Sequence, residues 1–155
     1  MPLLIDGHNL IGRMPDLSLE DPDDEAALVQ RLRRYCWRHR RRATVVFDAG
    51  IPGGRSLALS SPEVQVVFAP TGRTADALLC ERIRRARDPA GLIVISSDRS
   101  VQAAARARGA RVIPAEDFAT ELIADRKTEL EEEEKPRSVG DLEEWLRLFN
   151  ERRKT

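Results

Sequence analysis

The sequence of 155 residues predicts an α/β fold with three layers, built on a mainly parallel sheet of about five strands. Five short apolar runs rich in Val, Ile and Leu recur along the chain. Runs of this kind suit strands that are covered on both faces. Helix-length segments separate most of them, and alternating strands and helices indicate a parallel sheet with right-handed crossovers and helices on both faces.

The elements follow from the spacing of apolar residues. Strands are expected at 2–6, 43–48, 64–68, 92–96 and 111–114. Helices are expected at 24–40, 74–87 and 100–108, and Gly109 is placed to end the last of them. The stretch 49–62, with Gly53 and Gly54, joins two strands without a clear helix. Because it follows Asp48 directly, we expect this loop to border a functional site and to be mobile.

The chain is expected to divide into a domain at residues 1–126 and a tail at residues 127–155. The tail begins with an acidic run that is typical of a solvated linker or of the frayed end of a helix. Beyond it, Leu142, Trp145, Leu146 and Phe149 follow the i, i+3, i+4, i+7 spacing of an amphipathic helix. We expect this C-terminal helix to dock on the domain, with a partner surface as the alternative.

Composition excludes some classes of protein. The 26 basic and 26 acidic residues give zero net charge, so charge alone does not argue for a nucleic-acid partner. Cys36 and Cys80 form no CxxC pair and complete no zinc pattern with His8 or His39. Two isolated cysteines predict reduced thiols and a cytoplasmic protein. The sequence has neither a long apolar stretch nor a basic leader, so we expect neither a membrane span nor secretion.

Three apolar runs end in aspartate, at Asp6, Asp48 and Asp98. The carboxyl ends of parallel strands share one edge of a sheet, so these side chains are expected to converge. Asp76, in the first turn of the helix opened by Thr74, faces the same edge. Each aspartate also has an ordinary explanation as a turn or capping residue. Together, however, clustered carboxylates repel one another and favour a bound Mg²⁺ or Mn²⁺.

A site of this kind suits hydrolysis of a phosphodiester by a metal-activated water. Asn9 is placed to reach the same edge as a neutral ligand or substrate contact. Arg55, Arg73 and Arg99 lie next to proposed site elements in the sequence, so they are the preferred phosphate contacts. The other arginines are more simply explained as solvated helix faces.

The block Leu3–Ile11, reading LLIDGHNLI, resembles the opening of the YacP-like NYN domains, a branch of the PIN-like nuclease superfamily. The likeness continues, in the same order, through 45–49, 72–76, 94–99 and 144–149. The resemblance implies a sheet of order 3-2-1-4-5 and a divalent-metal endoribonuclease that cuts messenger RNA on the ribosome. By the same resemblance, Asp6, Asp76 and Asp98 are the catalytic acids and metal ligands, and Asn9 and Asp48 support them.

Two alternatives stay open. The first is a non-catalytic RNA- or ribosome-binding module that keeps the fold with a weak metal site. The second, a phosphotransferase domain, has little support, because the chain has no P-loop and no GxGxxG motif after its first strand. The sequence leaves the oligomeric state open.

Overall fold

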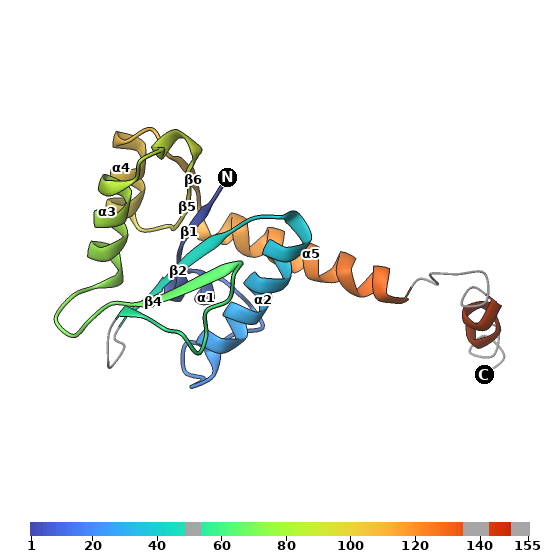
Figure 1. Ribbon diagram of the computed structural model, residues 1–155. Coiled ribbons are helices and arrows are strands. Elements are labelled where there is room, and N and C mark those ends of the chain that lie inside the picture. Colours follow the sequence, from blue (N-terminus) through green and yellow to red (C-terminus); the bar gives the residue numbers. More distant parts are fainter. Residues whose placement is uncertain (49–53, 135–142, 150–155) are drawn as a thin grey trace. The chain divides into compact units, whose positions relative to one another are not determined.

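The structure is a computed structural model that describes residues 1–48, 54–134 and 143–149. The chain forms two compact units, Met1–Leu122 and Ile123–Thr155. Figure 1 shows the elements along the chain. In order, they are β1 (Leu3–Asp6), α1 (Gly7–Ile11), α2 (Asp24–His39), β2 (Ala43–Phe47), β3 (Gly54–Arg55), β4 (Val64–Phe68), α3 (Ala75–Arg85), η1 (Pro89–Gly91), β5 (Ile93–Ile95), α4 (Arg99–Ala107), β6 (Arg111–Ile113) and α5 (Ala115–Glu134).

The sheet has six strands in the order β3-β4-β2-β1-β5-β6. Five of them pair in parallel, and their order confirms the predicted 3-2-1-4-5 arrangement. The difference is β3, an additional antiparallel strand in which Gly54 pairs with Phe68 at the edge. Gly54 has a φ of 100°, a backbone conformation that favours glycine. A two-residue strand is too short to show the period on which the sequence-based prediction depended.

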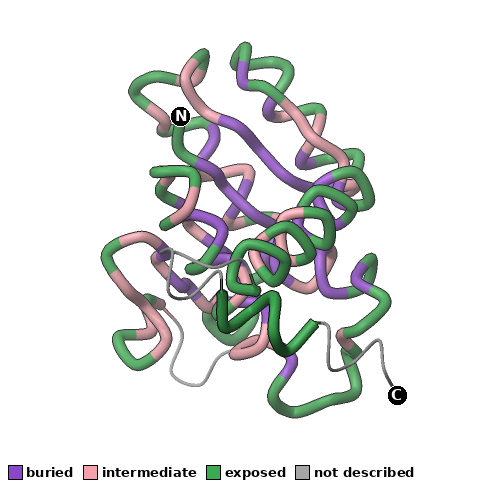
Figure 2. Tube along the Cα trace, turned by 90° about the vertical axis from the view of Figure 1, so that its right-hand side faces the viewer, coloured by how far each residue is buried: buried purple, intermediate pink, exposed green. Residues whose placement is uncertain are grey.

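Helices cover both faces of the sheet, as predicted. Side chains alternate along a strand, so Leu3 and Ile5 of β1 enter one core while Leu4 enters the other. The first core is closed by α1, α2 and α5, and the second by α3 and α4. Figure 2 shows the buried strands as a band between more exposed segments. The central strands are therefore apolar on both faces, which explains their continuous hydrophobic runs.

The predicted bounds of α2, α3 and α4 agree with the structure to within two residues. Thr74 caps α3 by accepting a hydrogen bond from the backbone N–H of Ala77. Gly109 follows α4 with a φ of 76°, as expected of a residue that ends a helix. Two helices were missed. Helix α1 is too short to show helical periodicity, and α5 follows β6 where no helix was expected.

The acidic run of the tail is helical, because α5 continues through it to Glu134. A further helix covers 143–149, in which the rings of Trp145 and Phe149 stack with their centroids 5.4 Å apart. Leu142 and the rest of 135–142 lie outside the described residues, as do 49–53 of the predicted mobile loop. The docking of the C-terminal helix stays a prediction. Over the described ranges, no helix is both long and apolar enough to cross a membrane.

Candidate active site

Four aspartates meet at the edge formed by the carboxyl ends of the parallel strands (the carboxyl edge). Asp6 is the last residue of β1, Asp48 follows β2 directly, and Asp98 is the N-cap of α4, which follows β5. Asp76 is the second residue of α3 and lies in its first turn. The charges of the other three each raise the pKa of Asp6, so the four carboxylates act on one another. The fold thus gathers side chains that are up to 92 positions apart in the sequence.

Asp6 is the buried member of this cluster, with 5% of its surface exposed. Its pKa is raised from 3.8 to about 6, mainly because burial disfavours the charged form. A hydrogen bond from the Ser96 hydroxyl to Asp6 Oδ2, 3.0 Å long, opposes this rise. The charges of Asp76, Asp48 and Asp98 add to it. Asp6 is therefore the carboxylate that would gain most from a nearby cation.

Asp76 and Asp98 respond in opposite directions. The pKa of Asp76 is raised by burial, by the charge of Asp98, by a side-chain hydrogen bond with Asp98 and by the charge of Asp48. The pKa of Asp98 is lowered, above all by the hydrogen bond that it accepts from the Ser100 hydroxyl, and further by the backbone N–H groups of Val101 and Ser100. Of this pair, Asp98 therefore loses its proton more readily than Asp76 does.

Asp48 holds the start of α3 in place. Its Oδ1 accepts a hydrogen bond from the backbone N–H of Ala75 at 2.7 Å, next to Asp76. The backbone N–H of Asp48 donates to Nδ1 of His8 at 3.3 Å. Because Nδ1 accepts, the imidazole proton is on Nε2, which donates to Glu25 at 2.9 Å. A chain of contacts therefore connects α2, through His8 and Asp48, to the position of Asp76.

Asn9 supports the site from α1. Its Oδ1 accepts a hydrogen bond from the backbone N–H of Ser97 at 2.8 Å. The Ser97 hydroxyl donates to Glu116 and accepts from the backbone N–H of Ala115 at 2.9 Å. In this arrangement Asn9 fixes the segment between β5 and Asp98, and its amide oxygen is engaged with the protein.

The three predicted phosphate contacts differ in their surroundings. Arg99 is exposed and directly follows Asp98 at the start of α4. Arg73 precedes α3, but its guanidinium is held 2.7 Å from Glu81, which also pairs with Arg85 at 3.0 Å. Arg55 lies on β3, opposite Val67 and one residue beyond the Gly54–Phe68 pair. Among the described residues, Arg99 thus directly follows a site carboxylate in the chain and forms no ion pair.

The residues present suit a hard divalent cation. Within the part of the chain that the structure describes, no three His, Cys, Asp or Glu side chains lie close enough together to hold an ion. Mg²⁺, however, usually takes one or two carboxylates and completes its shell with water and substrate phosphates. An all-oxygen donor set in which neighbouring carboxylates raise the pKa of Asp6 and of Asp76 fits that requirement. That Asp6, Asp76 and Asp98 are the ligands stays a prediction.

Sequence reasoning missed two polar residues of the site, Ser96 and Glu25. Ser96 was assigned to the end of a strand, and it is fully buried where its hydroxyl connects Asp6 to the backbone N–H of Asp98. The signal was two consecutive serines ending an apolar run just before Asp98. Glu25 gave no such signal, because its contact with His8 depends on how α2 packs.

Replacing Ser96 with alanine is expected to raise the pKa of Asp6 above about 6, because the hydrogen bond that favours the carboxylate is lost. The change also removes the buried acceptor of the Asp98 N–H, at a cost of about 1–3 kcal/mol in unfolding free energy. Carboxyl NMR titration and urea unfolding measure the two effects. Ser100→Ala is the control, because Ser100 is exposed and bonds to Asp98. An unchanged Asp6 titration in Ser96→Ala would contradict the assignment.

Comparison with known proteins agrees with this geometry. A model of the YacP-like NYN domain family matches residues 3–150. The protein YacP of Bacillus subtilis (strain 168) is 35% identical over 89 residues, which are 54% of this chain and 49% of that protein. That match therefore spans about half the length of the curated relative.

Two crystal structures of Rae1 (YacP) from Bacillus subtilis are similar over nearly the whole chain. One has a TM-score of 0.66 at 26% identity and covers 99% of this chain and 95% of the other. The second, of a W164L mutant, has a TM-score of 0.68 at 26% identity and covers 94% and 89%. The family match, the sheet order and the aspartates at the carboxyl edge agree. The chain belongs to the YacP-like NYN domain family, whose fold is of a nuclease type.

Proposed function

We propose that this protein is a divalent-metal-dependent endoribonuclease that hydrolyses RNA phosphodiester bonds at the carboxyl edge. The observation that carries the proposal is the buried Asp6, whose pKa is raised to about 6 by burial and by three neighbouring carboxylates. A fold that only bound RNA would gain affinity by losing negative charge next to the phosphates. Keeping four carboxylates at this edge is better explained by a bound cation.

The role of each side chain would depend on how readily it ionises. The lowered pKa of Asp98 keeps it ionised at neutral pH, as a metal ligand must be. A bound cation would offset the burial and repulsion that raise the pKa of Asp6 and of Asp76, and would favour the ionised form of each. Bound Mg²⁺ or Mn²⁺ would supply Lewis-acid stabilisation of the charge that builds on the phosphate. Arg99 would orient a phosphate, while Asn9 and Asp48 keep the acids in position.

We further propose messenger RNA as the substrate and the ribosome as the setting, which rest on the family resemblance. The alternative is a non-catalytic RNA- or ribosome-binding module with a weak metal site. Asp6→Asn and Asp76→Asn separate the two. In a nuclease these changes remove cleavage, whereas in a binding module they leave RNA affinity unchanged or increase it.

The test is cleavage of a mixed RNA substrate with Mg²⁺, with Mn²⁺ or with EDTA. The wild type is expected to cut only with metal, and Asp6→Asn and Asp76→Asn are each expected to lower the rate at least about 100-fold, because removing one electrostatic partner of the transition state typically costs that much. Asp88→Asn is the matched control. Asp88 caps η1 at the opposite end of β5, and asparagine can still accept the bond from the backbone N–H of Gly91.

Cutting that persists in EDTA, or in both aspartate variants, would contradict the proposal. If free RNA is not cut, the same variants are assayed on translating ribosomes. Metal-dependent cutting there, lost in Asp6→Asn and Asp76→Asn, supports a ribosome-dependent enzyme. Co-sedimentation with ribosomes without any cutting supports the binding module instead.

A further inference from the structure

Helix α2 carries an exposed tryptophan that the proposed chemistry does not use. Trp37 has 73% of its surface exposed, whereas Tyr35 and Cys36 beside it are 1% and 0% exposed. An exposed indole is a flat apolar surface on which a nucleic-acid base can stack.

The charge around Trp37 favours a polyanion. Residues 26–42 contain seven arginines and no acidic residue. One of these arginines, Arg31, forms an ion pair with Asp16, so its charge is already neutralised. Over the described ranges, no ion pair neutralises Arg33 or Arg34, and both are exposed. The charge of Glu63, which directly precedes β4, acts on the buried Cys36.

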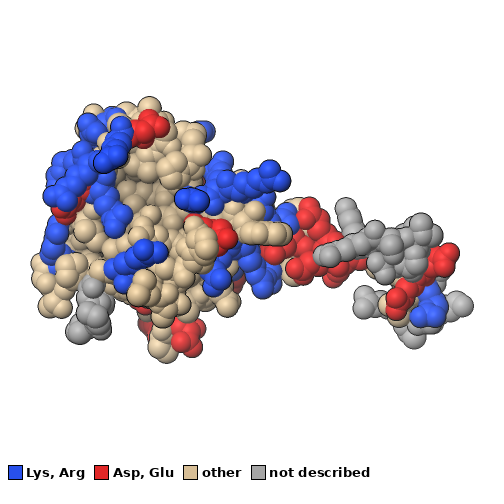
Figure 3. All heavy atoms as spheres, viewed as in Figure 1, with Lys and Arg blue, Asp and Glu red and all other residues tan. Residues whose placement is uncertain are grey.

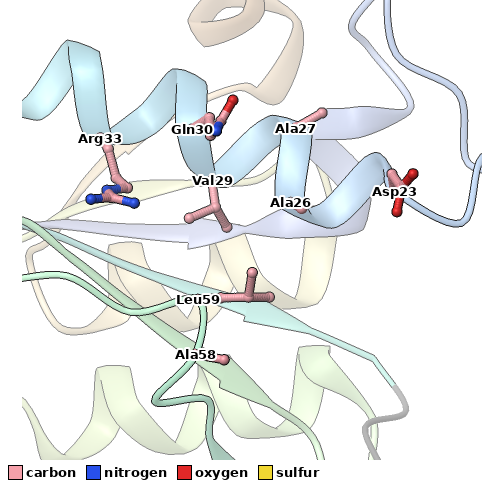
Figure 4. Close-up of a pocket in the computed structure, with 8 residues that line it drawn as sticks. All are labelled: Asp23, Ala26, Ala27, Val29, Gln30, Arg33, Ala58 and Leu59. Atoms are coloured by element: carbon pink, nitrogen blue, oxygen red, sulfur yellow. The ribbon is translucent and has the colours of Figure 1, made fainter.

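A cavity borders α2 on the N-terminal side of Trp37. Gln30, Arg33 and Trp37 are spaced by three and four residues, so they form one stripe along the helix. The first two line a cavity of about 340 Å³, whose far wall is Ala58 and Leu59. Figure 4 shows Gln30 and Arg33 on α2 and Leu59 on the segment that faces it. The exposed part of α2 therefore carries a stacking surface at Trp37, two arginines that form no ion pair among the described residues (Arg33 and Arg34), and a concave, partly apolar wall beside Gln30 and Arg33.

This stripe leads away from the carboxyl edge. Glu25, in the first turn of α2, contacts His8 at the site, whereas the other end of α2 precedes the start of β2. Trp37 lies twelve positions beyond Glu25, which is about 18 Å along a helix. Asp23 lines the cavity at its site-proximal end and would disfavour a phosphate there. A base or ribose suits the cavity, and Arg33 and Arg34 suit the phosphates beyond it.

We propose that the exposed face of α2 is a binding track for single-stranded RNA, in which a base stacks on Trp37 and phosphates contact Arg33 and Arg34. The inference deepens the proposed nuclease function, because it assigns the substrate as an unpaired strand that extends well beyond the cleaved bond. Pairing would hide the base from the indole, so duplex RNA is excluded from this track.

A second basic surface is the alternative site at which RNA could bind. Arginines of α3 and α4, on the other face of the sheet, gather at the left of Figure 3 over these two helices. Arg85 on this surface is already paired with Glu81. The tryptophans of the chain are Trp37 and Trp145, so neither α3 nor α4 offers an indole for stacking. The α2 face combines charge with stacking and is therefore the better candidate.

The test measures binding of a labelled, unstructured RNA in EDTA by fluorescence anisotropy, without any cleavage. Trp37→Ala is expected to weaken binding roughly 5- to 100-fold, the range for loss of one base–aromatic stack, and Trp37→Phe to retain most of the affinity. Arg34→Gln is expected to reduce the slope of log affinity against log salt by about 0.7. Arg106→Gln, an exposed arginine on α4, is the matched control and is expected to leave the slope unchanged.

Equal binding by wild type and Trp37→Ala would overturn the inference, as would weaker binding by Arg106→Gln alone, which would place the RNA on α3 and α4. Preference for duplex RNA, or for an acidic protein that displaces the RNA from this face, would also overturn it. These outcomes are separate from the nuclease test. If metal-dependent cleavage occurs while Trp37→Ala binds RNA normally, the binding track is wrong and the nuclease function stands. If RNA binds through Trp37 but is never cleaved, the binding track stands and the nuclease function is wrong.

Discussion

Asp6→Asn is expected to stabilise the metal-free protein at neutral pH by about 3 kcal/mol while it abolishes cleavage. Folding raises the pKa of this carboxyl from 3.8 to about 6. Each pH unit between these values corresponds to about 1.4 kcal/mol, so holding Asp6 ionised in the fold costs about 3 kcal/mol. Asparagine carries no charge, and its side-chain oxygen can still accept the hydrogen bond from the Ser96 hydroxyl. The variant thus keeps the local contact and loses the buried charge.

The direction in which the stability of the wild type changes with pH follows from the raised pKa of Asp6. Between about pH 4 and about pH 6 the folded state binds more protons at Asp6 than the unfolded state does. The stability of the wild type therefore falls as the pH rises through this window. Below it, Asp6 is protonated in both states, and the advantage of Asp6→Asn disappears. Above it, the advantage reaches its full value.

Urea unfolding in EDTA at several pH values measures this difference. Asp88→Asn, at the opposite edge of the sheet, is expected to change stability by less than about 0.5 kcal/mol at every pH. Added Mg²⁺ or Mn²⁺ should stabilise the wild type and have less effect on Asp6→Asn, because a ligand that binds only the folded state increases its stability. A variant that is less stable than the wild type at neutral pH would show that the buried, ionised Asp6 does not destabilise the fold.

The sequence predicted the convergence of the aspartates because that convergence depends only on topology. Asp6, Asp48 and Asp98 each follow an apolar strand, and parallel strands bring their carboxyl ends to one edge. Asp76 reaches the same edge because α3 begins where the chain leaves β4. None of this required knowledge of side-chain packing.

What the sequence did not predict depends on packing across elements. The contact of His8 with Glu25 joins two helices whose relative position no local pattern determines. Arg73 lies near Asp76 in the sequence, yet its guanidinium pairs with Glu81, two turns into α3. Likewise, Tyr35 and Trp37 are similar in sequence context, but only one of them faces the core. The spacing of residues in the sequence predicts which face of a helix or strand a side chain lies on. Which residue it contacts there depends on how the elements pack in the fold.

The packing around Gly7 was likewise not predictable from the sequence. Gly7 directly follows β1 and is the first residue of α1. The structure shows that a glycine is needed because Phe47 lies against it. A Cβ added at Gly7 would meet Cε1 of Phe47 at 2.3 Å and Cγ2 of Val45 at 3.0 Å. The Phe47 ring is fully buried and packs against His8 and Phe68, with centroids 5.1 and 5.5 Å away.

Gly7→Ala is therefore expected to lower the unfolding free energy by about 3 kcal/mol, because a packed ring must move to admit one methyl group. The gain of about 1 kcal/mol in helix propensity is too small to offset this. Displacing Phe47 also moves Asp48, the next residue, so cleavage should weaken with stability. Gly12→Ala is the matched control: it ends the same helix, its added Cβ would meet atoms no closer than 3.5 Å, and its φ of −62° suits alanine. Urea unfolding compares them, and equal stability of the two variants would refute the steric role of Gly7.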